Sequence, residues 1–262
     1  GFSNHDASLG YFNSPLVNIV CTVFLLIAAL NFSLHYAAVS SRSVKGYFKD
    51  PEFKAFFFIQ ATLILICFLV LVLSGFYESA ETALDQAMIQ AVSISTTAGF
   101  ATTDFSVWPT FLPILLIFSS FIGGCASSTG GGLKVVRVCL LFLQGKREVD
   151  RLIHPKAVYA VKLGERAMPD RVVEAVWGFF SAYAVVFVIL MVGLIATGLD
   201  NLSAFTATAA MLNNLGPGLG SVASNYADVS DPGKWILVVG MVFGRLEVFS
   251  LLVLFSPTFW RS

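Results

Sequence analysis

Charged side chains are scarce in this sequence. Only 12% of its 262 residues are Asp, Glu, Lys or Arg, whereas 56% are hydrophobic. An ordinary soluble domain carries about 25% charged residues, so this composition excludes a soluble globular chain and predicts an integral membrane protein within a lipid bilayer. The net charge is zero. The sequence therefore lacks the basic excess that would neutralise phosphates, and we expect no nucleic acid as a partner.

Residues that form metal sites, disulfides or catalytic centres are also few. The sequence has no CxxC pair and neither the GxGxxG nor the GxxxxGK[ST] motif, so we expect no organic cofactor on this chain. No histidine lies in a predicted span beside a Ser or Cys partner, which argues against a membrane enzyme. The histidines are His5, His35 and His154, and the cysteines, which we expect to be small core residues, are Cys21, Cys67, Cys125 and Cys139.

Apolar runs occupy most of the chain. Four are long enough to cross a bilayer, at about residues 15–40, 52–75, 172–197 and 235–255. A fifth, at 108–145, is too long for one span, and a cluster of glycines interrupts it. Two shorter runs end near residues 97 and 214. At about 1.5 Å per helical residue they cover only about half of a hydrocarbon layer of about 30 Å, so we expect each to enter the membrane without crossing it.

Basic and acidic residues fall into different connecting segments. Lys and Arg concentrate in segments 42–54 and 134–171, whereas the other connections carry mostly Asp and Glu. Because cytoplasmic loops are enriched in Lys and Arg, the basic segments are predicted to lie in the cytoplasm. Both half-length helices then enter from the outside, where acidic residues raise the local concentration of cations. The acidic residues on that side are Asp6, Glu78, Glu81, Asp85, Asp104, Asp200, Asp228 and Asp231.

The first half-length run leads into the stretch SISTTAGFATTDFS, residues 93–106. The carbonyl end of a helix carries about half a negative charge, and backbone carbonyls in a glycine-containing loop can replace the water around an alkali ion. Gly99 can adopt a positive φ at no steric cost and so turn those carbonyls inward. The pattern favours a cation site, and a re-entrant turn that binds nothing is the alternative.

The sequence repeats itself around these loops. GFATTDFS at Gly99 matches GFSNHDAS at Gly1, 98 residues earlier (99 − 1), and NNLGPGLG places Gly216 117 residues after Gly99 (216 − 99). The unit is a span, a half-length helix, a polar glycine loop and a second span, and transport folds are often built from such repeats. Because the chain opens inside a unit, without Met or a signal peptide, we expect it to be a fragment.

Four motifs together resemble the Trk/Ktr/HKT superfamily of cation transporters, and within it the bacterial TrkH-type potassium-uptake pore subunits. They are STTAGF, SSTGGGLKVVR, NNLGPGLG and the closing FSPTFWRS. The resemblance covers the whole chain and implies an all-α integral membrane fold. In that fold, potassium-channel-like repeats (span, re-entrant pore helix, filter loop, span) surround a pseudo-four-fold pore. Residues 1–51 would be the end of the second repeat, 52–171 the third and 172–262 the fourth.

The resemblance also assigns residues to a filter whose backbone carbonyls bind K+. In the third repeat these are Thr96, Thr97, Ala98, Gly99 and Phe100; in the fourth they are Asn214, Leu215, Gly216 and Pro217; and Gly1 is the last trace of the second. With two filter loops, the chain does not close a ring of four by itself.

The glycine cluster inside the run 108–145 has two interpretations. Non-helical backbone at membrane depth is tolerated where it lines a cavity or is buried in protein, and the resemblance implies an intramembrane gating loop below the filter. Close helix packing through small residues is the alternative. The candidate gating residues in this loop are Gly123, Gly124, Ser127, Ser128, Thr129, Gly130, Gly131 and Gly132.

Arg245 lies near the middle of the last predicted span, where a charge marks either a transport pathway or an ion pair. The resemblance implies that this arginine projects into the pore below the filter and assists closure. An ion pair is the structural alternative, although Glu247 is too close in sequence to face the same way on a helix.

The resemblance implies potassium uptake across a bacterial inner (plasma) membrane by a homodimer, with K+ as the transported ion. It also implies that the basic segment 146–171 docks a cytosolic, nucleotide-binding regulatory subunit of the TrkA type. A topology signal or anionic lipid headgroups would explain the same charges. The alternative function is an ion-coupled secondary transporter of a small solute, which needs intramembrane carboxylates; the spans offer only Glu247 and Glu174.

Overall fold

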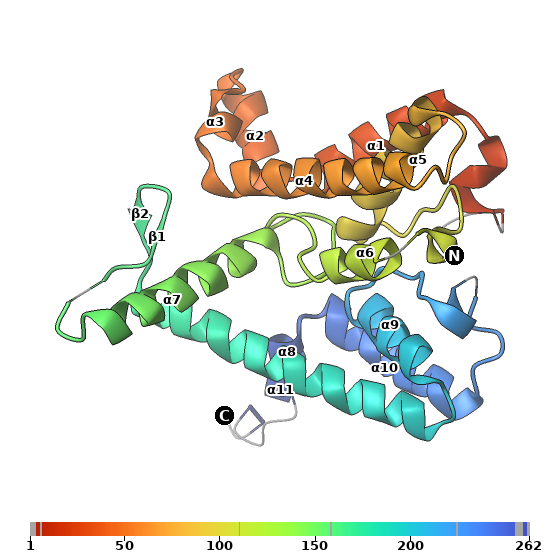
Figure 1. Ribbon diagram of the computed structural model, residues 1–262. Coiled ribbons are helices and arrows are strands. Elements are labelled where there is room, and N and C mark those ends of the chain that lie inside the picture. Colours follow the sequence, from red (N-terminus) through yellow and green to blue (C-terminus); the bar gives the residue numbers. More distant parts are fainter. Residues whose placement is uncertain are drawn as a thin grey trace.

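The computed structural model describes residues 4–5, 7–109, 111–157, 159–223, 225–254 and 259–260, and these are mainly helical (Figure 1). The predicted helical class is confirmed; a small antiparallel hairpin in the basic segment was not predicted. The α-helices are α1 (Pro15–Ala28), α2 (Phe32–Ser41), α3 (Lys45–Lys49), α4 (Pro51–Leu73), α5 (Ala80–Ser95), α6 (Leu112–Ser120), α7 (Val135–Ile153), α8 (Asp170–Ala196), α9 (Asn201–Leu212), α10 (Asp231–Arg245) and α11 (Val248–Leu254). The 3-10 helices are η1 (Ser8–Phe12), η2 (Phe105–Val107) and η3 (Gly220–Val222), and the hairpin strands are β1 (Lys162–Leu163) and β2 (Arg166–Ala167).

Among the described residues, two helices are long and apolar enough to cross a membrane unbroken. They are α4, with 23 residues, and α8, with 27. About 20 apolar residues suffice for a bilayer, so both lengths fit. The helix α4 begins sharply because Pro51 occupies its first turn and the Asp50 carboxylate accepts a hydrogen bond from the Phe53 N–H. The predicted spans 52–75 and 172–197 are confirmed.

The predicted spans 15–40 and 235–255 are not single helices. The first is the pair α1 and α2, bent by 91°, and the second is the pair α10 and α11, bent by 106°. At the first break the Asn31 side chain accepts a hydrogen bond from the Ser33 N–H and so starts a new helix. At the second break Glu247 adopts a left-handed φ of 56°, which ends the helical path. The apolar composition runs through both breaks and conceals them.

The half-length helices α5 and α9 have 16 and 12 residues, which agrees with the prediction that neither crosses the membrane. Side chains cap both at their first turn: Ser79 accepts from the Thr82 N–H and Asp200 from the Ser203 N–H, each at 3.1 Å. Hydrogen bonds from Ser203 lower the pKa of the Asp200 carboxyl group, so this cap is negatively charged at neutral pH.

The two half-length helices lie inside the molecule. The helix α5 packs against α1, α4 and α6, whereas α9 packs against α6, α8 and α10, so α6 lies between the two groups (Figure 1). Alanines at the contacts allow this close approach. The shared core contains Ala87, Ala91, Leu112, Leu116, Ala209 and Ala210. This packing brings the C-terminal ends of α5 and α9 to the centre of the molecule.

Candidate ion pathway

The loops that follow α5 and α9 have the same backbone conformation. Thr97 and Asn214, the second residue after each helix, are left-handed with φ of 61° and 56°. Gly99 and Gly216, two residues later, also have positive φ, of 77° and 101°. Each pair is separated by 117 residues (214 − 97 and 216 − 99). The alignment that the sequence suggested therefore relates residues that share a positive φ.

The two helices also end with the same hydrogen bonds. The Ala98 N–H donates to the Ser93 carbonyl at 2.8 Å, and the Leu215 N–H donates to the Ala210 carbonyl at 2.7 Å. A bond over five residues around a left-handed residue is the Schellman motif, which normally uses glycine at that residue. Threonine and asparagine take its place here. Each helix thus stops at a fixed residue with its carbonyl end directed at the loop.

Residue 99 must be a glycine because of its contacts as well as its backbone conformation. A Cβ atom on this residue would overlap the Leu215 carbonyl oxygen of the other loop and lie 3.4 Å from Pro217 Cδ. The two loops are therefore in direct contact, and only a glycine at residue 99 permits it.

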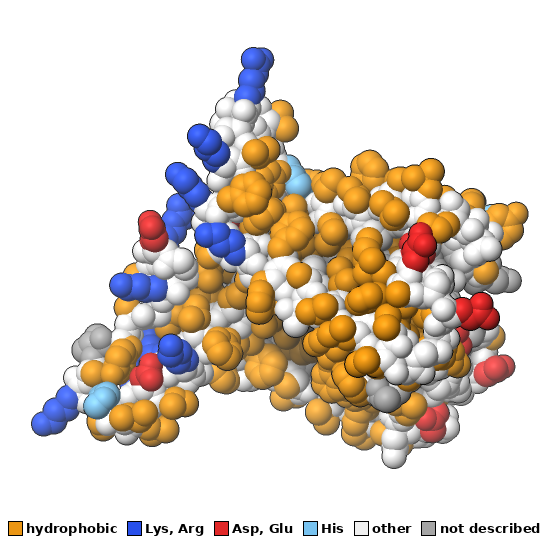
Figure 2. Space-filling view, turned by 45° about the horizontal axis from the view of Figure 1, so that its top comes forward, with side chains coloured by type: hydrophobic (Ala, Val, Ile, Leu, Met, Phe, Trp, Pro, Cys, Tyr) orange, Lys and Arg blue, Asp and Glu red, His pale blue; other side chains and the backbone are white. Residues whose placement is uncertain are grey.

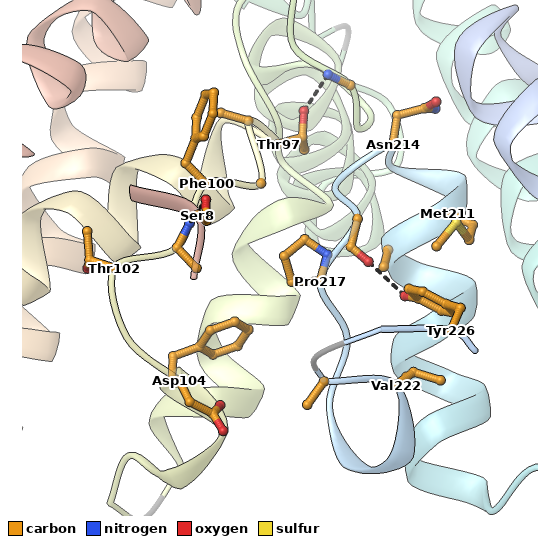
Figure 3. A pocket seen from close by; sticks show the side chains of 18 of the residues that line it. Ser8, Thr97, Phe100, Thr102, Asp104, Met211, Asn214, Pro217, Val222 and Tyr226 are labelled. Atoms are coloured by element: carbon orange, nitrogen blue, oxygen red, sulfur yellow. Dashed lines mark hydrogen bonds between the residues drawn. The ribbon is translucent and has the colours of Figure 1, made fainter. Parts of the chain in front are cut away.

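One cavity of about 1110 Å³ lies along both loops (Figure 3). Its wall includes residues from α9 and α10, and Tyr226 from the connection between them. Of the predicted filter residues, Thr97, Ala98, Gly99, Phe100, Asn214, Gly216 and Pro217 line it. Thr96 and Leu215 are buried behind it. Of the predicted gating residues, Thr129, Gly131 and Arg245 line it.

The segment 121–134 between α6 and α7, named here the intramembrane loop, lies directly against the ends of α5 and α9. The Gly131 N–H donates to Thr97 Oγ1 at 2.5 Å. A Cβ atom on Gly130 would lie 2.9 Å from the Thr96 carbonyl oxygen, and one on Gly131 would overlap the Asn213 carbonyl oxygen. Glycine lets this loop approach both helix ends at backbone distance.

The sequence model of the TrkH family, described as a cation transport protein, matches residues 1–262. The chain belongs to the TrkH family. It is 64% identical over 264 residues to the Trk system potassium uptake protein TrkH of Vibrio parahaemolyticus serotype O3:K6 and 60% identical over 262 residues to that of Salmonella typhimurium. The alignments cover the whole of this chain and 54% of each relative. The chain therefore spans about half the length of the curated relatives it matches.

A solved TrkH-family structure has the same fold. The crystal structure of the potassium transporter TrkH from Vibrio parahaemolyticus matches with a TM-score of 0.95 and 64% sequence identity, over 99% of this chain and 56% of that one. The predicted membership of the family and its fold class, an all-α, potassium-channel-like membrane protein, are confirmed.

The remaining glycines of the intramembrane loop in this TrkH-family chain fold the loop onto itself. Gly123 and Gly132 both have φ of 71°, and a Cβ atom on Gly132 would lie 2.7 Å from the Ser120 carbonyl oxygen. A Cβ atom on Gly124 would lie 2.6 Å from Ser128 Oγ. Ser127 is left-handed, with φ of 54°. These four predicted gating residues and Ser128 shape the loop without lining the cavity.

Arg245 is the last residue of α10 and not, as predicted, near the middle of an unbroken span. Its Nη1 atom donates to the Thr129 carbonyl at 3.4 Å, and the side chain lines the cavity. Glu247 pairs with Arg137 of α7, at 2.6 Å between Nη2 and Oε2. As predicted, Arg245 and Glu247 therefore face different partners. The ion pair is formed by Glu247 with Arg137.

Two hydroxyl groups that fix the loops were missed from the sequence. Ser93 Oγ donates to the Phe100 carbonyl at 2.6 Å, and the Tyr226 hydroxyl donates to the Gly216 carbonyl at 2.7 Å (Figure 3). Ser93 is the first residue of the stretch 93–106, but its position in the sequence gives no indication of the bond to Phe100. Tyr226 lies ten residues beyond its acceptor, in a segment without periodicity. Gly1, the remaining predicted filter residue, lies outside the described residues.

Proposed function

We propose that this chain supplies two filter loops of a potassium-uptake pore. The observation that carries the proposal is the meeting, along one cavity, of two loops with positive φ at the same two positions, each at the carbonyl end of a half-length helix. Helix carbonyl ends and loop carbonyls are the ligands that replace the hydration shell of an alkali cation. Thr96, Thr97, Ala98, Gly99 and Phe100 form one loop and Asn214, Leu215, Gly216 and Pro217 the other.

The names of the relatives support potassium as the transported ion, since each is a Trk system potassium uptake protein. The order of elements supports the division into repeats at 1–51, 52–171 and 172–262. A long helix, a half-length helix, a loop and a broken segment follow one another twice, as α4, α5, α6 and α7 and as α8, α9, α10 and α11. Each of the proposed third and fourth repeats thus contributes one loop.

The intramembrane loop is the proposed gate. Gly130 and Gly131 lie against the inner ends of both filter loops, and Arg245, from the following repeat, donates to the Thr129 carbonyl. A fixed positive charge in a cation pathway raises the energy of a permeating ion. Displacement of the loop and of Arg245 would therefore be needed for full conduction.

An ion-coupled transporter of a small solute is less well supported. Such a transporter needs a carboxylate in the membrane that is free to bind the coupling ion. Of the two candidates, Glu247 is paired with Arg137, and Glu174 is exposed near the basic end of α8. Neither lines the cavity between the filter loops.

The proposed location is a bacterial inner membrane, with the filter side of the molecule facing outside and the basic segments in the cytoplasm. In the view of Figure 2, Lys and Arg gather at one end of the molecule and most of the visible Asp and Glu at the other, in agreement with the positive-inside rule. The proposed assembly is a homodimer that docks a cytosolic regulatory subunit of the TrkA type. The Trk system named for the relatives supports such a partner, and the basic segment 146–171 is its proposed surface.

Uptake of radioactive rubidium into proteoliposomes tests this function. The full-length protein that contains this chain is reconstituted, with empty liposomes as the control and potassium, sodium and lithium as competitors. We expect uptake that potassium inhibits more strongly than sodium. Solute accumulation driven by an ion gradient, without rubidium flux, would establish the secondary transporter in its place.

A further inference from the structure

Glu52, the second residue of α4, is a buried carboxylate with only 6% of its surface exposed. Its Oε1 atom accepts two backbone hydrogen bonds, from the Ala126 N–H at 2.7 Å and the Val136 N–H at 3.1 Å. Ala126 lies in the first half of the intramembrane loop, and Val136 in the first turn of α7, just beyond the loop. One carboxylate oxygen therefore joins the two flanks of the loop.

A charge of opposite sign holds the same loop from within. Lys134 Nζ donates to the carbonyls of Gly130 and Ser128, the second at 3.4 Å. Hydrogen bonds to ionised groups are about twice as strong as those between neutral groups. The N–H groups of the flanks are thus bound by Glu52, while carbonyls of the middle are bound by Lys134.

The residues between these attachment points are the ones that contact the filter and Arg245. Thr129 accepts from Arg245, and Gly131 donates to Thr97. Ala126 and Val136, at the two ends of this segment, both donate to the same oxygen of Glu52. The position of that carboxylate therefore fixes where the loop meets the filter. Removal of the side chain leaves two N–H groups without this acceptor.

We propose that Glu52 is a positioning residue that holds the intramembrane loop against the filter and so sets how often the pore opens. This inference rests on the gating role proposed above. Glu52 acts through the loop and does not line the cavity. Its removal is therefore expected to change the rate of uptake and to leave the preference for potassium over sodium unchanged.

Two substitutions in the full-length protein separate the hydrogen bonds from the charge. In Glu52→Ala both hydrogen bonds lose their acceptor, and we expect the initial rate of rubidium uptake to rise on the order of tenfold, which corresponds to a shift of about 1.4 kcal/mol in a two-state equilibrium. In Glu52→Gln the amide oxygen can accept both N–H groups, because both bond to the same oxygen, but the bonds lose their charge assistance, so the uptake rate is expected to lie between that of the alanine variant and that of the unchanged protein. Glu174→Ala, an exposed glutamate near the start of α8, is the matched control. Equal uptake rates in Glu52→Ala and the unchanged protein would overturn the proposal, as would a shift in ion preference.

Amide hydrogen exchange tests the same inference without transport. Peptides that cover residues 124–136 are expected to exchange faster in Glu52→Ala than in Glu52→Gln or Glu174→Ala, because only the alanine variant frees the amides of Ala126 and Val136. Unchanged exchange in the alanine variant would refute the positioning role. If that variant does not fold, fast exchange of these peptides in a folded Glu52→Gln protein would refute it equally. Absence of rubidium flux from the unchanged protein would instead count against the pore itself, so the two failures are distinguishable.

Discussion

At the scale of single residues, contacts between loops decide which substitutions the proposed filter tolerates. Gly99 combines a left-handed backbone with direct contact to the Leu215 carbonyl. Gly75, after α4, has nearly the same conformation, with φ of 63°, but a Cβ atom there would meet nothing within 4 Å. A comparison of substitutions at Gly99 and Gly75 therefore separates the free-energy cost of a left-handed backbone from the cost of contact with the Leu215 carbonyl.

We predict that Gly99→Ala impairs potassium selectivity and that Gly75→Ala does not. Both variants pay about 1–2 kcal/mol for a left-handed alanine. Only Gly99→Ala must also move the Leu215 carbonyl, and a displacement that removes about 1.4 kcal/mol of binding free energy weakens K+ binding about tenfold. Competition of potassium and sodium with rubidium uptake by the full-length protein is the measurement. Equal selectivity in the two variants would contradict the assignment of Gly99 to the filter.

The sequence was sufficient to predict the glycines of this site but not the side chains that orient the loops. A glycine between apolar runs points to a positive φ, and the 117-residue spacing relates Gly99 to Gly216. The left-handed Thr97 could not be predicted, because a β-branched residue seldom takes the place of glycine at a helix end, whereas Asn214 is of a type that sometimes does. The bond from Tyr226 to Gly216 depends on the path of an irregular segment, which periodicity does not determine.

At the scale of elements, length and hydrophobicity predicted the straight helices and concealed the bent ones. The spans α4 and α8 follow from apolar runs bounded by polar residues. In the runs 15–40 and 235–255 the breaks depend on one capping side chain and one left-handed residue, Asn31 and Glu247. Both breaks contact the neighbourhood of the intramembrane loop: the Cys125 N–H donates to the Ala29 carbonyl, and Glu247 pairs with Arg137.

We predict that the break between α10 and α11 stores strain at Glu247. Glu247→Ala loses the ion pair with Arg137 and keeps the left-handed strain. Glu247→Gly loses the same pair but relieves the strain, so it should be more stable than the alanine variant by about 1 kcal/mol. Thermal unfolding of the full-length protein in detergent measures this difference. Equal unfolding temperatures for the two variants would show that the break is not strained.

At the scale of the whole molecule, the separation of charges predicts how the chain lies in the membrane. Lys49, in α3, is exposed and belongs to the basic segment 42–54, and Asp228, between α9 and α10, is exposed and belongs to the acidic connections. The acidic end carries the N-terminal caps of α5 and α9, so it is also the end from which both half-length helices enter. If that end is outside, cations reach the filter loops from an acidic surface that concentrates them.

Thiol labelling of single cysteines determines this orientation. We predict that a membrane-impermeant maleimide labels Asp228→Cys in intact spheroplasts, whereas it labels Lys49→Cys only after lysis, because the positive-inside rule puts the basic end in the cytoplasm. Cys67 and Cys125 are buried, so a background in which Cys21 and Cys139 are replaced by serine leaves little competing thiol within this chain. Labelling in the reverse order would show that the molecule has the opposite orientation in the membrane. The filter would then open to the cytoplasm, and the proposed direction of uptake through an acidic outer mouth would be wrong even if the pore conducted potassium.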